Sequence, residues 1–538
     1  MKRPASVAVL ALAGWLHAGL LPPGVAYAHD EGPPGFECVN GPFGLPGPQG
    51  PPSVNGEWSP LMQWPERAIH SSLMHTGKVL WWSGLTLDAW VWDPATEQHT
   101  MHPAPTDLLC AGHAALADGR ILTIGGTSPT TTELPDTNIF DPVAETWTEA
   151  ADMWQGRWYP TATTLPDGRI LAVSGRLQTQ PFMFAKIPEI YDPDTDTWTQ
   201  LTGAQKTLLY YPFQHVLPDG KLYVAGPDLN TWLLDWDTET WTQSASSLTE
   251  GSGGTVTMYR PWNFMKRGES DEVEVIDMSG PTPQWREVAA TTFPRRDANL
   301  VNLPDGTIFL VGGSVDGKSS PECAVHQTAI WDPATEMWTP MASLQDARMY
   351  HATATLLPDG RVLAGGGENS HTAGGNQTAE IFSPPYLFKG PRPTVAAAPA
   401  SVGWGQGFQV ETPDAASIAS VVFIRPGSNT HNFDMDDRSL PLSFTSSATQ
   451  LDLTAPADGN LAPPGYYLLF LVDTNGVPSM GQFVQVGSPT PAVPSLSIPA
   501  LTLLAALLMS GGYGWTRRGC PRRPLEGGDT SHEETSSG

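Results

Sequence analysis

Residues 348–367 read RMYHATATLLPDGRVLAGGG, and the pattern of this stretch recurs along the chain. A run of small or β-branched residues leads to Leu-Pro-Asp-Gly, and an apolar run that ends in glycines follows. This tetrapeptide, or its variant Leu-Ala-Asp-Gly, stands at 116–119, 165–168, 217–220, 303–306 and 357–360. Proline presets φ and glycine accepts a positive φ, so each copy predicts two strands joined by a tight turn.

A second signal follows these turns at a fixed spacing. An aspartate precedes a tryptophan by six residues in the pairs Asp141/Trp147, Asp192/Trp198, Asp235/Trp241 and Asp332/Trp338. Four strands per unit at a period of about 43 to 54 residues are typical of a β-propeller. Two degenerate copies, near residues 70–103 and 254–288, complete seven blades. We interpret the tryptophans as wedges between blades.

Composition and charge agree with an all-β protein that does not bind polyanions. The chain of 538 residues contains 54 Gly, 53 Pro and 20 Trp, which suits many turns and large aromatic wedges. This length implies more than one domain. With 28 Lys and Arg against 55 Asp and Glu, the formal charge is -27. Nucleic acid or acidic lipid would be repelled.

Both ends of the chain carry targeting signals. Residues 1–28 combine a basic start, an apolar stretch and a small-residue cleavage site, which predicts a secretory signal peptide. Residues 29–60 form an N-terminal extension. Residues 489–538 contain a linker, an apolar helix at 496–515 that is long enough to span a bilayer, and an arginine-rich tail. We expect an exported protein, either secreted or held at the cell surface through this helix.

The region between these signals divides into two parts. Residues 61–388 contain the seven repeats, and residues 389–488 contain alternating strands that predict a small immunoglobulin-like β-sandwich. His431 lies on a loop between two of these strands. We expect the acidic run that begins at Asp434 to be a solvated loop, positioned by Arg438.

Four cysteines, Cys38, Cys110, Cys323 and Cys520, raise a question of pairing. Cys520 lies beyond the apolar helix, so an odd number remains in the exported part. A disulfide between Cys38 and Cys323 is one of two open possibilities, and it would leave Cys110 as a thiol.

Four reactive side chains stand at the heads of repeat units. Cys110 opens CAGHAALADGRILTIGG, Tyr159 lies in RWYPTATTLPDGRILAVSG, and Tyr350 and His351 lie in the stretch quoted first. Each position corresponds to the start of an innermost strand, so the four side chains should converge on one axial funnel. His113 is interpreted as structural, with a supporting role behind the site as the alternative.

The strings LCAGHAALADGR, GRWYPTATTLPDGR, RMYHATATLLPDGR and GSNTHNFDMDDRSLPL resemble the galactose oxidase and glyoxal oxidase family of copper radical oxidases. The likeness covers roughly residues 60–488, that is, kelch-type repeats followed by a sandwich. RWYPTA and YYPFQHVLPDGKLYVAG are more similar to the glyoxal oxidase branch. The start of the tail, VPSLSIPALTLL, resembles bacterial sorting tags of the IPTL type, which implies a bacterial protein handled by sorting machinery.

The resemblance implies a cofactor, a site and a reaction. One copper ion would be held by Tyr159, Tyr350, His351 and His431, and Cys110 would be joined to Tyr159 by a thioether bond. The catalytic residues would be Cys110, Tyr159 and Tyr350, the last as general base. The reaction would oxidise a small aldehyde or primary alcohol and reduce O2 to H2O2. We expect a monomer with no nucleic-acid partner.

Physical chemistry agrees with such a site. Cu(II) favours imidazole nitrogen and oxygen donors in a tetragonal arrangement. Copper cycles by one electron, whereas alcohol oxidation removes two, so a sulfur-substituted tyrosine ring would supply the second redox equivalent. The alternative function is a non-catalytic surface-binding or carbohydrate-binding kelch propeller.

The chain departs from galactose oxidase in one respect. Galactose oxidase stacks a tryptophan on the cross-linked tyrosine, but the stretch after Ser174 contains none. Trp158, Phe182 or Phe184 could cover the ring instead. Trp158 is a strand neighbour of Tyr159 and should point to the opposite face. The identity of the substrate is left open.

Overall fold

The computed structural model describes residues 38, 47, 50–128, 133–177, 183–251, 253–317, 320–372 and 374–487, which belong to one compact unit. The predicted signal peptide at 1–28, the apolar helix at 496–515, the sorting tail and Cys520 lie outside these residues and stay predictions. Among the residues just given, no helix combines the length and apolarity that crossing a membrane requires.

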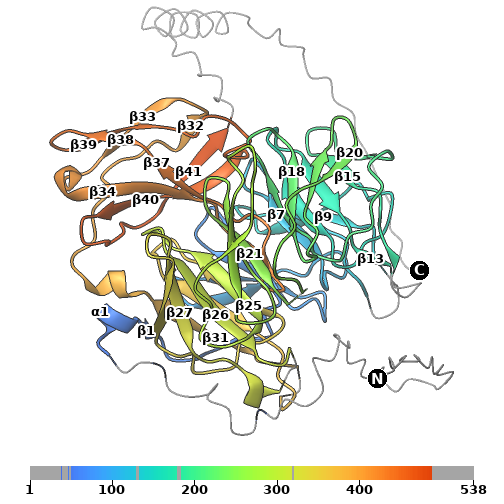
Figure 1. Ribbon diagram of the computed structural model, residues 1–538, viewed down its shortest axis with the longest axis horizontal. Coiled ribbons are helices and arrows are strands. Elements are labelled where there is room, and N and C mark those ends of the chain that lie inside the picture. The colour runs from blue at the N-terminus through green and yellow to red at the C-terminus, as the bar shows by residue number, and fades with distance from the viewer. Residues whose placement is uncertain are drawn as a thin grey trace, which may run out of the picture. The chain divides into compact units, whose positions relative to one another are not determined.

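In the described residues the repeats form seven antiparallel sheets arranged as the blades of a propeller, which confirms the predicted fold class (Figure 1). Blades 1 to 4 consist of β3 (His70–Leu73), β4 (Val79–Trp82), β5 (Ala89–Asp93) and β6 (Gln98–Met101); β7 (Gly112–Ala115), β8 (Ile121–Ile124), β9 (Thr137–Asp141) and β10 (Thr146–Ala150); β11 (Thr161–Thr164), β12 (Ile170–Val173), β15 (Glu189–Asp192) and β16 (Thr197–Gln200); β17 (Phe213–Val216), β18 (Leu222–Gly226), β19 (Trp232–Asp235) and β20 (Thr240–Gln243). Blades 5 to 7 consist of β21 (Thr255–Arg260), β22 (Asn263–Arg267), β23 (Val273–Asp277) and β24 (Arg286–Glu287); β25 (Arg296–Asn302), β26 (Ile308–Ser314), β27 (Thr328–Asp332) and β28 (Met337–Met341); β29 (Ala352–Leu356), β30 (Val362–Gly366) and β31 (Thr378–Ser383) with two N-terminal strands.

Two kinds of turn shape each blade. The Leu-Pro-Asp-Gly turns place their glycine at positive φ, for example +93° at Gly168, where a side chain would be strained. In the outer hairpins the aspartate of the Asp/Trp pair caps the turn: in blade 2 the Asp141 carboxylate accepts the amide hydrogen of Val143 at 2.8 Å. Because these bonds join residues that are close in the chain, the repeat can be recognised from the sequence.

The tryptophans of the Asp/Trp pairs join neighbouring blades, as predicted. Each indole Nε1 donates to a backbone carbonyl in the segment that leaves the preceding blade. The bonds are Trp147 to His102 (2.9 Å), Trp198 to Ala151 (2.9 Å), Trp241 to Ala204 (2.8 Å) and Trp338 to Ala289 (2.9 Å).

The N-terminal segment closes the ring of blades. After the short helix α1 (Pro52–Asn55), β1 (Glu57–Trp58) and β2 (Met62–Gln63) pair antiparallel with β31. Cys38 and Cys323 form a disulfide, which settles the pairing left open above and leaves Cys110 as the buried free thiol of the described chain. A disulfide is typical of proteins that leave the reducing cytosol.

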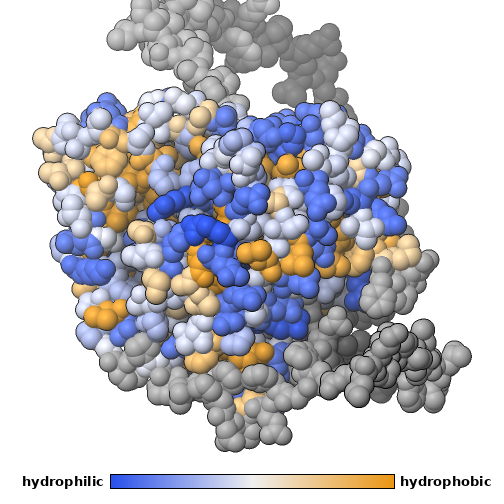
Figure 2. Space-filling view, in the orientation of Figure 1, coloured by the Kyte–Doolittle hydropathy of each residue, from blue (hydrophilic) through white to orange (hydrophobic). Residues whose placement is uncertain are grey.

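The second part is a sandwich of two sheets, drawn in orange and red in Figure 1. The larger sheet contains β32 (Ser401–Gly403), β41 (Gln482–Gly487), β40 (Gly465–Asp473), β34 (Ile418–Ile424) and β37 (Ser439–Leu442); the smaller contains β33 (Gly407–Glu411), β39 (Gln450–Thr454) and β38 (Phe444–Ser446). On the face of the molecule that Figure 2 shows, hydrophobic residues gather over the sandwich, and hydrophilic residues cover much of the rest.

One loop of the sandwich enters the propeller. This loop, residues 427–438, is called the finger here. Its strand β35 (Ser428–Thr430) pairs antiparallel with β3, the innermost strand of blade 1, and turns back through β36 (Phe433–Asp434). His431 lies at the turn between these two strands, so the loop predicted from sequence becomes an added strand of the propeller.

The acidic run of the finger is buried, and the expectation of a solvated loop is wrong. Asp437 accepts hydrogen bonds from the Thr257 hydroxyl of blade 5 at 2.9 Å and from the Asn302 amide of blade 6 at 2.6 Å. Asp436 forms an ion pair with Arg425 at 2.9 Å, and both side chains are buried. Arg425, rather than Arg438, therefore pairs with the acidic run.

Candidate metal centre

Four of the five predicted site residues share an unusual backbone conformation. The φ angles are +56° at Cys110, +66° at Tyr159, +66° at His351 and +48° at His431. A non-glycine residue in this region costs about 1–3 kcal/mol and tends to occur at functional sites. His351 immediately precedes the innermost strand of blade 7, and Cys110 and Tyr159 lie two residues before the innermost strands of blades 2 and 3. This placement explains how separate blades present side chains at one place.

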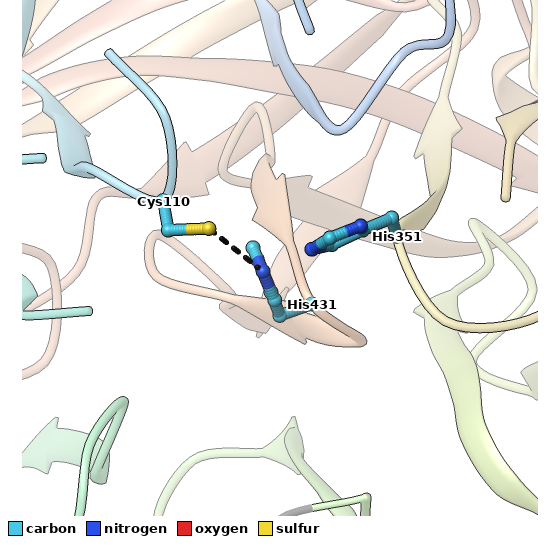
Figure 3. Close-up of side chains that lie close together, drawn as sticks. All are labelled: Cys110, His351 and His431. Atoms are coloured by element: carbon cyan, nitrogen blue, oxygen red, sulfur yellow. Dashed lines mark hydrogen bonds between the residues drawn. The ribbon is translucent and has the colours of Figure 1, made fainter. Parts of the chain in front are cut away.

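The structure brings all five predicted residues together. Cys110 Sγ lies 3.3 Å from His431 Nε2, and the Tyr159 and Tyr350 hydroxyls lie 3.3 Å apart. One potential ligand atom each from Cys110, His351 and His431 lies within 4.8 Å of the others (Figure 3). The Tyr350 ring stacks on His351 with centroids 3.8 Å apart. Each of the five residues is at most 8% exposed.

Hydrogen bonds determine which nitrogen of each histidine faces the centre. His351 Nδ1 lies 2.7 Å from Glu368 Oε1, and a carboxylate can only accept, so Nδ1 carries the hydrogen. The neutral ring then has its lone pair on Nε2.

The second histidine has the same tautomer for a different reason. The Thr430 hydroxyl donates to the Ile69 carbonyl at 3.0 Å, and it lies 2.6 Å from His431 Nδ1. The Thr430 hydroxyl has one hydrogen, which it donates to the Ile69 carbonyl. The hydroxyl therefore accepts the hydrogen of His431 Nδ1. Both histidines thus present Nε2, the arrangement in which metal-ligating histidines are usually held.

Burial keeps the acidic groups of the centre neutral when no cation is bound. Desolvation raises the pKa of the Cys110 thiol to about 12, although hydrogen bonds with Tyr159 and Trp158 act in the opposite direction. Burial also raises the pKa values of Tyr159 and Tyr350 well above the ordinary value for tyrosine. A divalent cation reverses this balance because it favours the phenolate.

Trp158 covers the Tyr159 ring, and the expectation that it points away is wrong. The two ring centroids are 4.5 Å apart with an interplanar angle of 31°. The alternation rule does not apply because both residues precede β11 and Tyr159 has a positive φ. Phe184 packs instead on Tyr210, with centroids 6.3 Å apart, and Phe182 lies outside the described residues.

Several residues around the centre were not predicted from the sequence. Arg67 and Glu368 contact each other at 2.6 Å beside His351. Tyr211 lies 5.2 Å from Tyr159 and 4.8 Å from His431, measured between ring centroids. Asp297, with φ of +59°, stands at the head of blade 6 as His351 does in blade 7. Its position in RRDANLVNLPDG could have marked it, since each repeat head is a candidate.

The histidines behind the centre are packing residues in this structure. His113 is fully buried and lies edge-on to Trp82, with centroids 5.0 Å apart. This contact agrees with the structural interpretation. His70 stacks on Trp82 at 4.7 Å and accepts the Cys110 amide hydrogen at 3.2 Å, so it supports the backbone at Cys110.

The donor set fits a copper ion. Two imidazole Nε2 atoms and two phenol oxygens are the nitrogen and oxygen donors that Cu(II) prefers, and the thiol stands beside one phenol.

Comparisons with known proteins agree with this assignment. The profile of the family "Glyoxal oxidase N-terminus" matches residues 85–255 and 252–386, and "Galactose oxidase-like, Early set domain" matches residues 392–486. Galactose oxidase from Gibberella zeae is 27% identical over 498 residues, covering 80% of this chain and 70% of that protein. Aldehyde oxidase GLOX from Vitis pseudoreticulata is 28% identical over 442 residues, covering 71% and 82%.

A solved structure extends the likeness to three dimensions. A fungal alcohol oxidase of the AA5 family, in complex with copper, superimposes with a TM-score of 0.73 at 25% identity, covering 80% of this chain and 99% of that one. The matched profiles span most of the propeller and the sandwich. The chain therefore belongs to the galactose oxidase and glyoxal oxidase-like family of copper radical oxidases.

Proposed function

We propose that the protein is an exported mononuclear copper oxidase that converts an aldehyde or a primary alcohol to its two-electron oxidation product while O2 becomes H2O2. The activity is closer to that of glyoxal oxidase than to that of galactose oxidase. The observation that carries the proposal is the convergence of two histidines, two tyrosines and a buried thiol from separate elements. Residues 1–28 would direct export, and residues 489–538 would determine release or retention.

His351, His431, Tyr159 and Tyr350 would hold the metal. When bound, copper supplies a one-electron oxidant and lowers the pKa of coordinated phenols. The two Nε2 lone pairs are already oriented by Glu368 and Thr430, so binding would need little rearrangement of either ring.

Cys110 and Tyr159 would form a thioether that supplies the second redox equivalent. The Tyr159 side chain acts on the pKa of the Cys110 thiol, and the Tyr159 amide donates to the Cys110 carbonyl at 3.0 Å, so the two residues are neighbours. Formation of a C–S bond beside the hydroxyl removes one hydrogen from sulfur and one from the ring. O2 accepts the two electrons and two protons and becomes H2O2.

Tyr350 would take the substrate's hydroxyl proton. Its oxygen lies 3.3 Å from the Tyr159 oxygen, so a substrate hydroxyl beside both oxygens could transfer its proton to the Tyr350 phenolate while the oxidised Tyr159 ring accepted a hydrogen atom from the adjacent carbon. An aldehyde enters this scheme as its hydrate, which has the required hydroxyl. Burial of the centre excludes bulk water from these transfers.

Mass spectrometry and a peroxide assay test the proposal. Protein loaded with copper in air should lose the mass of two hydrogen atoms, and its Cys110 and Tyr159 peptides should be recovered as one cross-linked species. Peroxide release should then appear with some members of a panel of aldehydes, primary alcohols and sugars. Cys110→Ser is the control and should show neither the link nor most of the oxidation. Absence of both signals in the copper-loaded wild type would favour the surface-binding alternative.

A further inference from the structure

The two histidines of the centre differ in what their Nδ1 atoms contact. His431 donates to the neutral Thr430 hydroxyl, whereas His351 donates to the Glu368 carboxylate at 2.7 Å. The same Glu368 oxygen lies 2.6 Å from an Arg67 guanidinium nitrogen. The side chain of Arg67 is 6% exposed and that of Glu368 is 29% exposed. Arg67, Glu368 and His351 therefore form a continuous chain of contacts that ends at the candidate ligand.

The backbone holds Glu368 in this place. The Glu368 amide donates to the Tyr350 carbonyl at 2.6 Å, and the Gly367 amide donates to the His351 carbonyl at 3.1 Å. Gly366 has φ of +70°, and a side chain there would meet the Ala68 carbonyl oxygen at 2.1 Å. The glycine run lets the chain turn closely behind Tyr350 and His351, and Glu368 emerges from that turn beside the imidazole.

A carboxylate and a hydroxyl have different effects on an imidazole donor. A carboxylate that accepts from Nδ1 fixes the ring and also makes Nε2 more basic, whereas a neutral hydroxyl fixes the ring with a weaker electronic effect. The Arg67 guanidinium, 2.6 Å from the same oxygen, orients the carboxylate. The centre would thus contain one strong and one weaker imidazole donor.

We propose that Glu368, held by Arg67, is a positioning residue that strengthens His351 as a metal ligand. The inference rests on the copper site of the proposed function. It assigns a role to a residue outside the predicted donor set, and it makes the two histidines unequal, because His351 Nδ1 contacts a carboxylate whereas His431 Nδ1 contacts a hydroxyl.

Copper titration of variants tests this role. Glu368→Gln keeps an acceptor for Nδ1 but removes the charge, and Glu368→Met removes both. Glu145→Gln is a matched control, because the Glu145 carboxylate also links a cation and a histidine (Lys78 at 2.7 Å and His102 at 3.2 Å) with 23% exposure, in the outer hairpin of blade 2. The readouts are Cu(II) affinity of metal-free protein in competition with a chelator at fixed pH, the electron paramagnetic resonance spectrum of the loaded protein, and the melting temperature of the metal-free protein.

We expect affinity to fall about 10- to 100-fold in the Glu368 variants, more for Met than for Gln, with an altered spectrum. Both variants leave the Arg67 charge without this partner, so their metal-free melting temperatures should also fall, and affinity is compared at a temperature at which every variant is folded. Glu145→Gln should match the wild type. Wild-type affinity and spectrum in both Glu368 variants would overturn the inference while leaving the proposed function intact. Failure of the wild-type protein itself to bind copper would overturn both.

Discussion

At the scale of single residues, Tyr350 separates catalysis from metal binding. Tyr350→Phe keeps the ring that stacks on His351 but removes the oxygen 3.3 Å from that of Tyr159. The variant should bind copper through the remaining ligands and turn over about 10²- to 10⁴-fold more slowly, since it lacks the proton acceptor. Copper content and the initial rate of peroxide release, measured on the same preparation, check this expectation.

His351→Ala and His431→Ala should behave differently from Tyr350→Phe. Each removes one of the two imidazoles of a buried site, and the neighbouring His70 already accepts the Cys110 amide hydrogen, so the isolated protein should be depleted in copper as well as inactive. If all three variants retained wild-type copper content and rate, the assignment of these residues would have to be abandoned.

Asp297 should make stability depend on pH. Burial raises the pKa of this carboxyl to about 7, although the charge of Arg296 acts in the opposite direction. An unfolded aspartate has a pKa of about 3.9. Between these values the folded protein holds a proton that the unfolded chain releases, so stability falls as pH rises from about 4 to 7. Asp434, whose pKa is raised to about 8 mainly by burial, acts in the same direction.

Asp297→Asn should remove the contribution of Asp297 to the pH dependence of the free energy of unfolding. The difference between the free energies of unfolding at pH 5 and pH 8, from urea titrations, should be smaller in the variant than in the wild type. Asp297→Asn combined with Asp434→Asn should flatten it further. A variant with the wild-type slope would mean that Asp297 is ionised throughout this range in the folded protein.

At the scale of elements, the finger matters most, because it carries His431 into the propeller. The Asp436–Arg425 pair at its base is almost completely buried, with side-chain exposures of 1% and 2%. Asp436 also accepts from the Ala115 amide of blade 2 at 2.8 Å. The pair therefore helps join the sandwich to the propeller at the level of the centre.

Asp436→Leu should lower the free energy of unfolding by about 3–5 kcal/mol, because it leaves the Arg425 charge buried without its partner. Arg425→Met should have a similar cost. The combined variant should cost less than the sum of the two, since neither charge is then left alone. Denaturant titration of the four proteins gives the coupling energy, and strictly additive costs would contradict the ion pair's contribution.

At the scale of the whole molecule, the ring of blades is closed by residues far apart in the sequence. β1 and β2 complete blade 7 by pairing with β31, and the Trp58 indole donates to the Ala342 carbonyl at 2.9 Å. The Cys38–Cys323 disulfide spans a sequence separation of 285 residues and ties the N-terminal segment to blade 6. Closure of the ring of blades thus depends on the pairing of the N-terminal strands β1 and β2 with β31.

Replacing both Cys38 and Cys323 by Ser should lower the free energy of unfolding by about 2–4 kcal/mol, because the unfolded chain gains freedom. Peroxide release per copper-loaded molecule should stay at the wild-type rate, since neither cysteine supplies a donor to the centre. Melting temperature and specific activity check the two parts separately. Loss of activity in a variant with an unchanged melting temperature would contradict this account.

Local sequence was sufficient for the repeat and for the kinds of residue in the centre. The Leu-Pro-Asp-Gly turns and Asp/Trp pairs depend on hydrogen bonds between residues a few positions apart, such as Asp141 and Val143. They can therefore be recognised from the sequence alone. The positions of Cys110, Tyr159 and His351 at the start of innermost strands could be predicted because every blade repeats the same order of strands.

The tertiary structure alone decided what surrounds those residues. Trp158 covers Tyr159 because a positive φ breaks strand alternation, and Asp437 is buried because donors from two blades meet it. Glu368 reaches His351 across a glycine turn, with Arg67 supplied from a segment about three hundred residues away. Repetition along the chain determines which residues face the axis, but the contacts between them depend on how blades and sandwich close around it, and no local pattern encodes that closure.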